Sequence, residues 1–186
     1  MGKPTNRIYK PSELGGIPRG FKVGFDIVLA QPSLQKPVNK TGTQVSIGKV
    51  AGAYGAFAPS LNRIVLTKDI YNVETIKHET GHAIDYKNEW ISKNKDGVFR
   101  TGGKNAPVKD WDNVLVNRFN RYVTTKDEIK SIAALKRRVK PWYYDYMNST
   151  EERFADAYNQ YKTQPTKMKG YAPTVYKWFR SNSKLL

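Results

Sequence analysis

The stretch TIKHETGHAIDYK, residues 75–87, contains both histidines of this 186-residue chain, His78 and His82. They are four residues apart, and Glu79 directly follows the first. On a helix, side chains four positions apart lie on the same face, one turn above the other. Two neutral imidazoles so placed can bind one zinc ion, and the adjacent glutamate can activate a water molecule. The stretch therefore predicts a catalytic zinc site on a helix.

The neighbours of this pair predict which side of the helix faces the core. With about 100° of rotation per residue, most apolar positions fall opposite the histidines. That apolar side comprises Val73, Ile76, Thr80, Ala83 and Ile84. Asp85 shares the histidine side, where its carboxylate can accept the second ring N–H of a histidine ligand. We expect a helix over about 73–89, with Asn72 as its N-cap.

The absence of cysteine restricts the ligands of any metal to His, Asp and Glu. A structural zinc site normally has four protein ligands, most often including thiolates, and the chain has only two histidines to offer. The alternative is that two surface histidines lie four apart by accident, which is a rare coincidence in a chain with no others. We therefore expect one catalytic zinc ion per chain, with a carboxylate as the third protein ligand.

The segment NSTEERFADAY, residues 148–158, is the best source of that carboxylate. Glu152 and Asp156 are four apart, so they share one face of a helix expected over about 149–163. Spacing alone leaves a second role open for Glu152.

That second role is helix capping, because Ser149 and Glu152 have capping-box spacing. Asn148 and Glu151 offer the same spacing, and that pairing would leave Glu152 free to face inward. Both interpretations stand at this point.

The motifs HETGHAID and EERFADAY together resemble the catalytic domain of the anthrax lethal factor family, which includes the clostridial Pro-Pro endopeptidases. In that family an HExGH helix is followed by a helix of pattern E-x-F-A-[ED], whose first Glu is the third zinc ligand. The resemblance implies a zincin-like metallopeptidase of the gluzincin type, with Glu152 as ligand and Asp156 as the second carboxylate. Weaker similarity in YGAFAPSLNRIVL and YAPTVYKWF extends the match over about residues 50–182, with gaps.

The chain departs from this family in three respects. The family has a tyrosine seven residues before the ligand Glu, whose hydroxyl stabilises the oxyanion, and here that position is Asp145. A shift of one residue selects Tyr146 or Tyr144, and we favour Tyr146, with a packing role as the alternative for either. The distance from His82 to the glutamate is also long, so residues 110–139 are expected to be a helical insertion. We expect no receptor-binding or translocation domain beside the motifs.

The order of predicted elements indicates an α+β fold, with a small N-terminal sheet, the active-site helix and a C-terminal helical part. Residues 1–42, punctuated by proline and glycine, are expected to form an extended basic arm, and 43–186 the catalytic domain. Strands are predicted at about 21–29, 43–50 and 62–67, with a glycine-rich turn between the last two. Helices are predicted at about 110–123, at 126–139 behind a Thr125–Glu128 capping box, and from Pro173 onward.

The residues before the active-site helix are candidates for a substrate cleft. An extended peptide can add to a strand edge, with side chains near that edge setting specificity. The candidates are Tyr54, Phe57, Asn62 and Arg63.

The net charge of +16, from 32 basic and 16 acidic residues, indicates contact with a polyanion. Nucleic acid, an anionic membrane and an anionic cell-wall polymer all fit, and a lysine-rich soluble surface is the plainer interpretation. No apolar run is long enough to span a bilayer, and no Sec signal peptide is recognisable at the N-terminus. We therefore expect a cytoplasmic, virion-associated or non-Sec-exported protein.

These observations predict a zinc metalloendopeptidase in which Glu79 acts as general base. The main alternative is a basic structural or packaging protein, such as a phage virion component delivered into the host. Such a protein would be part of a larger assembly and would use a metallopeptidase-like fold to bind nucleic acid or partner proteins. A third candidate is peptidase action on cell-wall cross-bridges.

Overall fold

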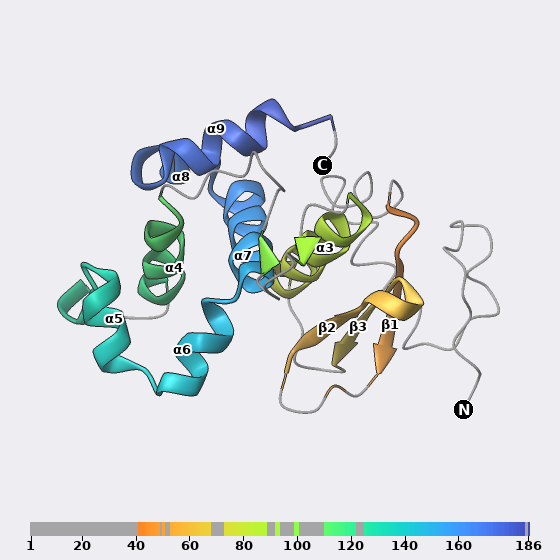
Figure 1. Ribbon diagram of the computed structural model, residues 1–186, viewed down its shortest axis with the longest axis horizontal. Helices are drawn as coiled ribbons and strands as arrows, with labels where there is room; N and C mark the ends of the chain where they lie inside the picture. Colours follow the sequence, from red (N-terminus) through yellow and green to blue (C-terminus); the bar gives the residue numbers. More distant parts are fainter. Residues whose placement is uncertain are drawn as a thin grey trace. The chain divides into compact units, whose positions relative to one another are not determined.

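Figure 1 shows the computed structural model of the chain. The structure describes residues 41–48, 50, 53–67, 73–88, 92–93, 99–100, 110–121, 125–184 and 186. The chain divides into two compact units, Met1–Lys87 and Asn88–Leu186. Almost all of the predicted N-terminal arm, its strand at 21–29 and the predicted cap Asn72 lie outside the described residues.

The first unit contains a three-stranded sheet with the strand order β1-β3-β2. Strand β1 (Gln44–Gly48) pairs in parallel with β3 (Arg63–Thr67), and β2 (Gly55–Ala58) pairs antiparallel with β3. A 3-10 turn, η2 (Pro59–Leu61), joins β2 to β3. The strands expected within 43–50 and 62–67 are confirmed, and part of the expected glycine-rich turn is itself a strand.

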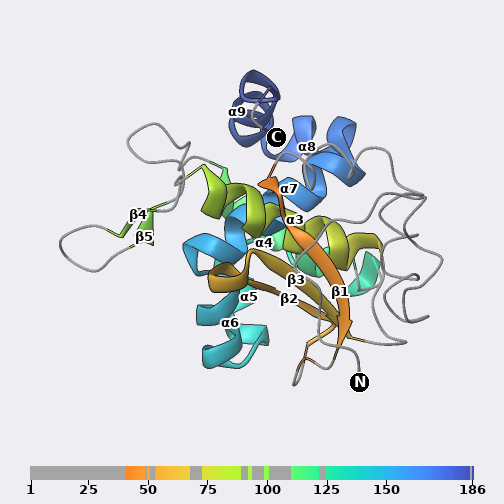
Figure 2. The ribbon, with the colours of Figure 1, turned by 90° about the vertical axis from the view of Figure 1, so that its right-hand side faces the viewer.

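Helix α3 (Val73–Lys87) packs on β2 and β3, as Figures 1 and 2 show, and confirms the helix predicted over about 73–89. Ile64 and Leu66 alternate along β3 toward the same side, and both are fully buried together with Ile76 of α3. The predicted apolar side of α3 is buried at four of its five positions, and Val73 is partly exposed. The sheet thus fixes α3 by a small, continuous core.

Gly55 of β2 lies where the sheet meets α3, and a side chain there should weaken this packing. A Cβ at residue 55 would lie 2.8 Å from Cγ2 of Thr75 and 3.2 Å from the backbone oxygen of Val65. We expect Gly55→Ala to lower the free energy of unfolding by about 1–3 kcal/mol, as overpacked substitutions do. Chemical denaturation measures this. Gly170→Ala is the control, because nothing lies within 4 Å of its Cβ, and it should stabilise by about 0.4–1 kcal/mol.

The second unit is mainly helical in its described residues. Its central helix, α7 (Thr150–Thr163), contacts α4 (Trp111–Asn120), α6 (Pro141–Met147), α8 (Pro165–Tyr171) and α9 (Pro173–Ser181) (Figure 1). A two-stranded antiparallel ribbon, β4 (Ser92–Lys93) and β5 (Phe99–Arg100), precedes the helices. The helical elements are α4 (Trp111–Asn120), η4 (Thr125–Asp127), α5 (Ile132–Arg138), α6 (Pro141–Met147), α7 (Thr150–Thr163), α8 (Pro165–Tyr171) and α9 (Pro173–Ser181).

Two apolar groups hold these helices together. Rings of α7 and α9 form the first, in which Phe179 stacks on Tyr161 at a centroid distance of 5.3 Å and contacts Phe154 at the same distance. The second group lies among α4, α5 and α6. It comprises Leu115, Ile129, Leu135, Tyr144 and Met147.

The predicted helix over 126–139 begins later than expected, at Ile132. The side chain of Asn120 accepts a hydrogen bond from the backbone N–H of Ile129 and donates one to its carbonyl, at 2.7 and 2.8 Å. These bonds hold Ile129 outside a helix, and Ser131 then becomes the N-cap, accepting from Ala134 N at 3.2 Å. The Thr125–Glu128 capping box was therefore wrong.

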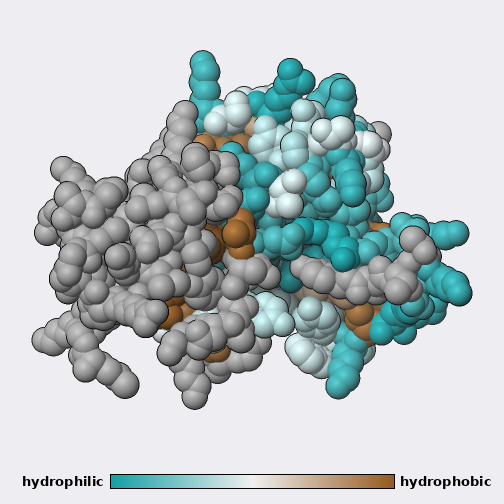
Figure 3. Space-filling model, turned by 180° about the vertical axis from the view of Figure 1, so that it is seen from behind, coloured by the Kyte–Doolittle hydropathy of each residue, from teal (hydrophilic) through white to brown (hydrophobic). Residues whose placement is uncertain are grey.

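The described residues thus contain a small three-stranded sheet and otherwise mostly helices, consistent with the α+β class. On the face drawn in Figure 3, most of the described surface is hydrophilic, and apolar side chains reach it only in small patches. None of the helices in the described part of the chain is long and apolar enough to cross a membrane.

Candidate metal centre

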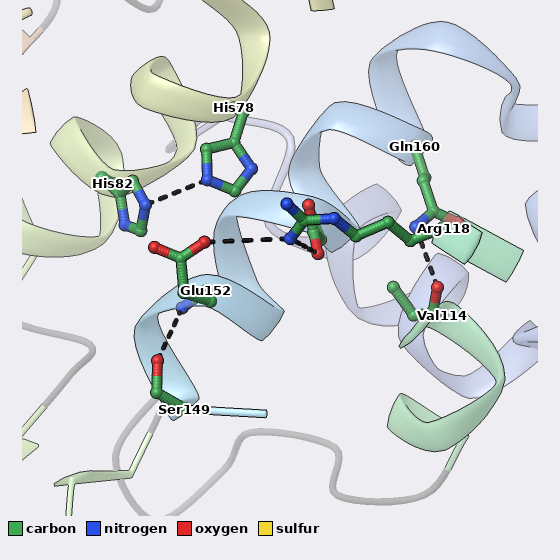
Figure 4. Close-up of polar contacts among 8 residues, drawn as sticks. His78, His82, Val114, Arg118, Ser149, Glu152 and Gln160 are labelled. Atoms are coloured by element: carbon green, nitrogen blue, oxygen red, sulfur yellow. Dashed lines mark hydrogen bonds and ion pairs between the residues drawn. The ribbon is translucent and has the colours of Figure 1, made fainter. Parts of the chain in front are cut away.

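His78 and His82 project from one face of α3, as the helical spacing predicts (Figure 4). Their Nε2 atoms lie 3.2 Å apart, and their ring planes are inclined by 85° with a centroid distance of 4.8 Å. Both side chains are partly exposed. The two imidazoles therefore direct their Nε2 atoms toward a common point rather than away from each other.

The separation of the two nitrogens matches what zinc requires. Two nitrogen ligands at about 2.0–2.1 Å from one tetrahedral zinc ion lie about 3.3 Å from each other. The same distance also suits a direct hydrogen bond between the rings, if one Nε2 carries a proton and the other does not. The geometry of α3 therefore fits a metal and needs little rearrangement to bind one.

The two carboxylates of the motif on α3 are both buried. Glu79 is 6% exposed and Asp85 is fully buried. Carboxylates are seldom placed in such positions unless they are paired or bind a metal. Because Asp85 is buried, its side chain has little freedom to reorient. Its role as hydrogen-bond acceptor for a ligand histidine stays a prediction.

Glu152, in the second unit, lies in the first turn of α7, next to the residues that cap this helix. Ser149 is the N-cap, and its Oγ accepts from the backbone N–H of Glu152 at 3.4 Å. The backbone N–H of Ser149 donates to the carbonyl of Tyr146 at 3.1 Å, so the cap does not require the Glu152 carboxylate. Asn148 ends α6 instead of capping α7, so the Asn148–Glu151 pairing was wrong.

Arg118 of α4 joins the two carboxylates of α7, and Figure 4 shows its contact with Glu152. Its Nη1 lies 2.5 Å from Oδ2 of Asp156 and 3.8 Å from Oε2 of Glu152. Burial alone would lower the pKa of Arg118, but the charges of Asp156 and Glu152 outweigh it and raise that pKa above its usual range. The guanidinium therefore stays charged and offsets the repulsion between two nearly buried carboxylates.

Sequence reasoning missed Arg118, although a signal for it exists. Trp111, Val114 and Leu115 are buried positions of α4, at the spacing of one helix face. Arg118 continues the same spacing, three residues after Leu115. A charged side chain on an apolar stripe requires a buried partner of opposite charge. The stripe therefore indicated a carboxylate nearby, but not which one.

The two candidate tyrosines of α6 differ in their surroundings. Tyr144 is 7% exposed, belongs to the second apolar group and lies beneath the Nζ of Lys136, which is 5.0 Å from the ring centroid. Tyr146 is 52% exposed. The packing role therefore applies to Tyr144, and Tyr146 is the tyrosine that can meet another molecule.

The candidate cleft residues of the first unit also divide into two kinds. Asn62 adopts the left-handed conformation, with φ 44°, and its side chain bonds to Thr43 and to the carbonyl of Thr41. Arg63 is 7% exposed. These two residues therefore serve the strand connections. Tyr54 is 61% exposed, and Phe57 is partly buried on β2, an edge strand of the described sheet.

Within each unit, the structure brings together His78 and His82 on α3, and Glu152 and Asp156 beside Arg118. Comparison with protein-family models, with curated proteins and with solved structures gives no match for this chain.

Proposed function

We propose that this chain is a zinc-dependent metalloendopeptidase of the gluzincin type with a zincin-like fold. The observation that carries the proposal is the 3.2 Å separation of the Nε2 atoms of His78 and His82, directly beside the buried Glu79. Catalytic zinc sites use neutral imidazoles and a carboxylate and leave one position for water or substrate. The motif resemblance points to the same class of enzyme.

His78, His82 and Glu152 are the proposed ligands of one zinc ion per chain. The resemblance of EERFADAY to the family helix supports Glu152, since its first glutamate occupies the ligand position. Its carboxylate is not needed by the cap of α7, and Arg118 offsets the charge of Asp156 beside it. Asp85 is proposed to orient a histidine ligand.

When bound, zinc would supply Lewis-acid chemistry, polarising the scissile carbonyl and acidifying a water molecule. Glu79 takes the proton from that water as it attacks, and then delivers a proton to the leaving amine. Tyr146, a half-exposed residue, is proposed to donate a hydrogen bond to the oxyanion, a contribution of about 3 kcal/mol per donor in well-studied hydrolases. An extended peptide pairs with the edge strand β2, beside Tyr54 and Phe57.

Arg118→Met should weaken both the fold and the metal site. Removing the guanidinium leaves two nearly buried carboxylates without their shared cation, and breaking a buried pair costs about 3–5 kcal/mol. Because 24% of the Arg118 side chain is exposed, we expect the lower end of that range in chemical denaturation. Zinc affinity should fall about 10–100-fold, as when an outer-shell partner of a ligand is lost. Competition with a fluorescent zinc chelator measures this.

Arg138→Met is the matched control for charge and size. Arg138 pairs with Asp127 at 3.4 Å, and both side chains are about half exposed. An exposed pair of this kind contributes at most about 1 kcal/mol. We expect this variant to keep the zinc affinity of the wild type, and an equal loss in both variants would contradict a specific role for Arg118.

A mass-spectrometric search of a peptide library tests the proposed activity. We expect the zinc-loaded chain to cleave internal peptide bonds, the activity to disappear after chelation, and added zinc to restore it. Muropeptides belong in the same screen, so that action on cell-wall cross-bridges would be detected. Cleavage that survives complete removal of metal would contradict the proposal.

A further inference from the structure

Helix α6 carries three aromatic side chains that remain exposed in the described structure. Trp142, Tyr143 and Tyr146 are 66%, 36% and 52% exposed, whereas Tyr144 and Met147 of the same helix are buried. Only six large hydrophobic side chains are exposed among the described residues, and three of them lie on these two turns. Exposed apolar side chains scattered singly are ordinary, but a cluster of this kind marks a surface that meets another molecule.

Basic residues lie directly beside this aromatic cluster in the chain. Residues 130–147 contain five lysines and arginines and one acid, Asp145. Arg137 and Lys140, just before α6, are both exposed. Lys136 already lies over the ring of Tyr144, at 5.0 Å, so a cation and an aromatic face are combined here within the fold. We call Arg137, Lys140, Trp142, Tyr143 and Tyr146 the aromatic–basic face.

We propose that the aromatic–basic face binds single-stranded nucleic acid. Its cations match the charge of a phosphate backbone, and its rings offer surfaces on which unpaired bases can stack. A duplex would use only the cations, because its bases are already stacked on one another. A membrane surface also accepts Trp and Tyr beside cations. However, α6 has only seven residues and exposes no Leu, Ile or Val, so it offers little apolar area to bury in lipid.

This face is a second functional surface, independent of the proposed zinc ligands. Part of the net charge of +16 would contact nucleic acid at this face. The chain would bind nucleic acid there whether or not it cleaves peptides. Tyr146 also belongs to the proposed oxyanion site, so it is left unchanged in the variants below.

Fluorescence anisotropy with a labelled single-stranded oligothymidylate of about 20 nucleotides tests the proposal on the full chain. We expect Trp142→Ala to weaken binding about fivefold or more, and Trp142→Phe, which keeps an aromatic face, to retain most of the affinity. Both variants should keep the circular dichroism spectrum and zinc content of the wild type. The duplex of the same length should bind more weakly than the single strand.

Two double variants that remove the same charge distinguish binding at the aromatic–basic face from general electrostatic attraction by the whole chain. Arg137→Gln with Lys140→Gln should reduce the slope of log affinity against log salt by about 1.4, if each residue meets one phosphate. Lys167→Gln with Lys169→Gln, on two exposed positions of α8, removes the same charge and should change the slope much less. Equal effects of the two pairs, with none from Trp142→Ala, would overturn the proposal. So would binding to anionic phosphatidylserine vesicles that depends on Trp142, without binding to the oligonucleotide.

Discussion

Glu79→Gln should slow peptide hydrolysis by about 10²–10⁴-fold while leaving the zinc content at one ion per chain. Glutamine keeps the shape of glutamate but cannot take a proton from water, and a positioned general base contributes about 10²–10⁴-fold to the rate. The buried position of Glu79, 6% exposed, leaves little room for solvent to substitute for it. We expect the turnover number to fall by about that factor. Single-turnover cleavage of the best library peptide, with zinc measured on the same samples, is the appropriate experiment.

Glu74→Gln is the matched control for this change. Glu74 lies in the first turn of the same helix and is partly exposed. Its loss should reduce stability by less than about 1 kcal/mol and leave the turnover number unchanged. If Glu79→Gln cleaved the peptide at the wild-type rate, Glu79 would not be the base and the proposed mechanism would be wrong.

His82→Ala should lose both the zinc and the activity. Removing one of two imidazoles whose nitrogens are 3.2 Å apart leaves a site that cannot complete three protein ligands. We expect zinc affinity to fall by more than about 100-fold, beyond the 10–100-fold typical of outer-shell changes. Zinc at 100 times its dissociation constant should stabilise the wild type by about 2.7 kcal/mol and leave His82→Ala unaffected. Thermal unfolding with and without zinc measures the difference.

Asp85→Asn gives an intermediate reference for the zinc affinity of His82→Ala. Asp85 is buried on α3 and is proposed to orient a zinc ligand rather than to be one. Its zinc affinity should lie between those of the wild type and His82→Ala. Equal stabilisation of wild type and His82→Ala by zinc would mean that the metal binds elsewhere on the chain.

Two helices were predicted from strong local signals in the sequence. Helix α3 has a long apolar face, and α9 begins with Pro173 at its first turn, so both lie close to their predicted bounds. Strand β2 was predicted as part of a turn because three of its four residues are glycine or alanine. Its pairing with β3 is a tertiary effect that local propensity does not report.

The start of α5 and the role of Arg118 could not be predicted from the sequence, for a related reason. Each depends on a side chain distant in sequence: Asn120 fixes the turn at Ile129, and Arg118 pairs with Asp156. Capping motifs compete, and only such contacts decide which of them forms. The histidine pair was predictable because its geometry depends on the helical period alone.

The zinc content of the purified chain, measured for the wild type beside Glu152→Ala and Glu151→Ala, tests the central claim most directly. Glu151 is the neighbour of Glu152 in the same helical turn and carries the same charge, so it controls for general effects on α7. We predict one zinc ion per chain in the wild type and in Glu151→Ala, and loss or sharp weakening in Glu152→Ala. A wild type that binds no zinc even when metal is added, or a Glu152→Ala variant that retains it fully, would contradict the assignment of His78, His82 and Glu152 as a metal site.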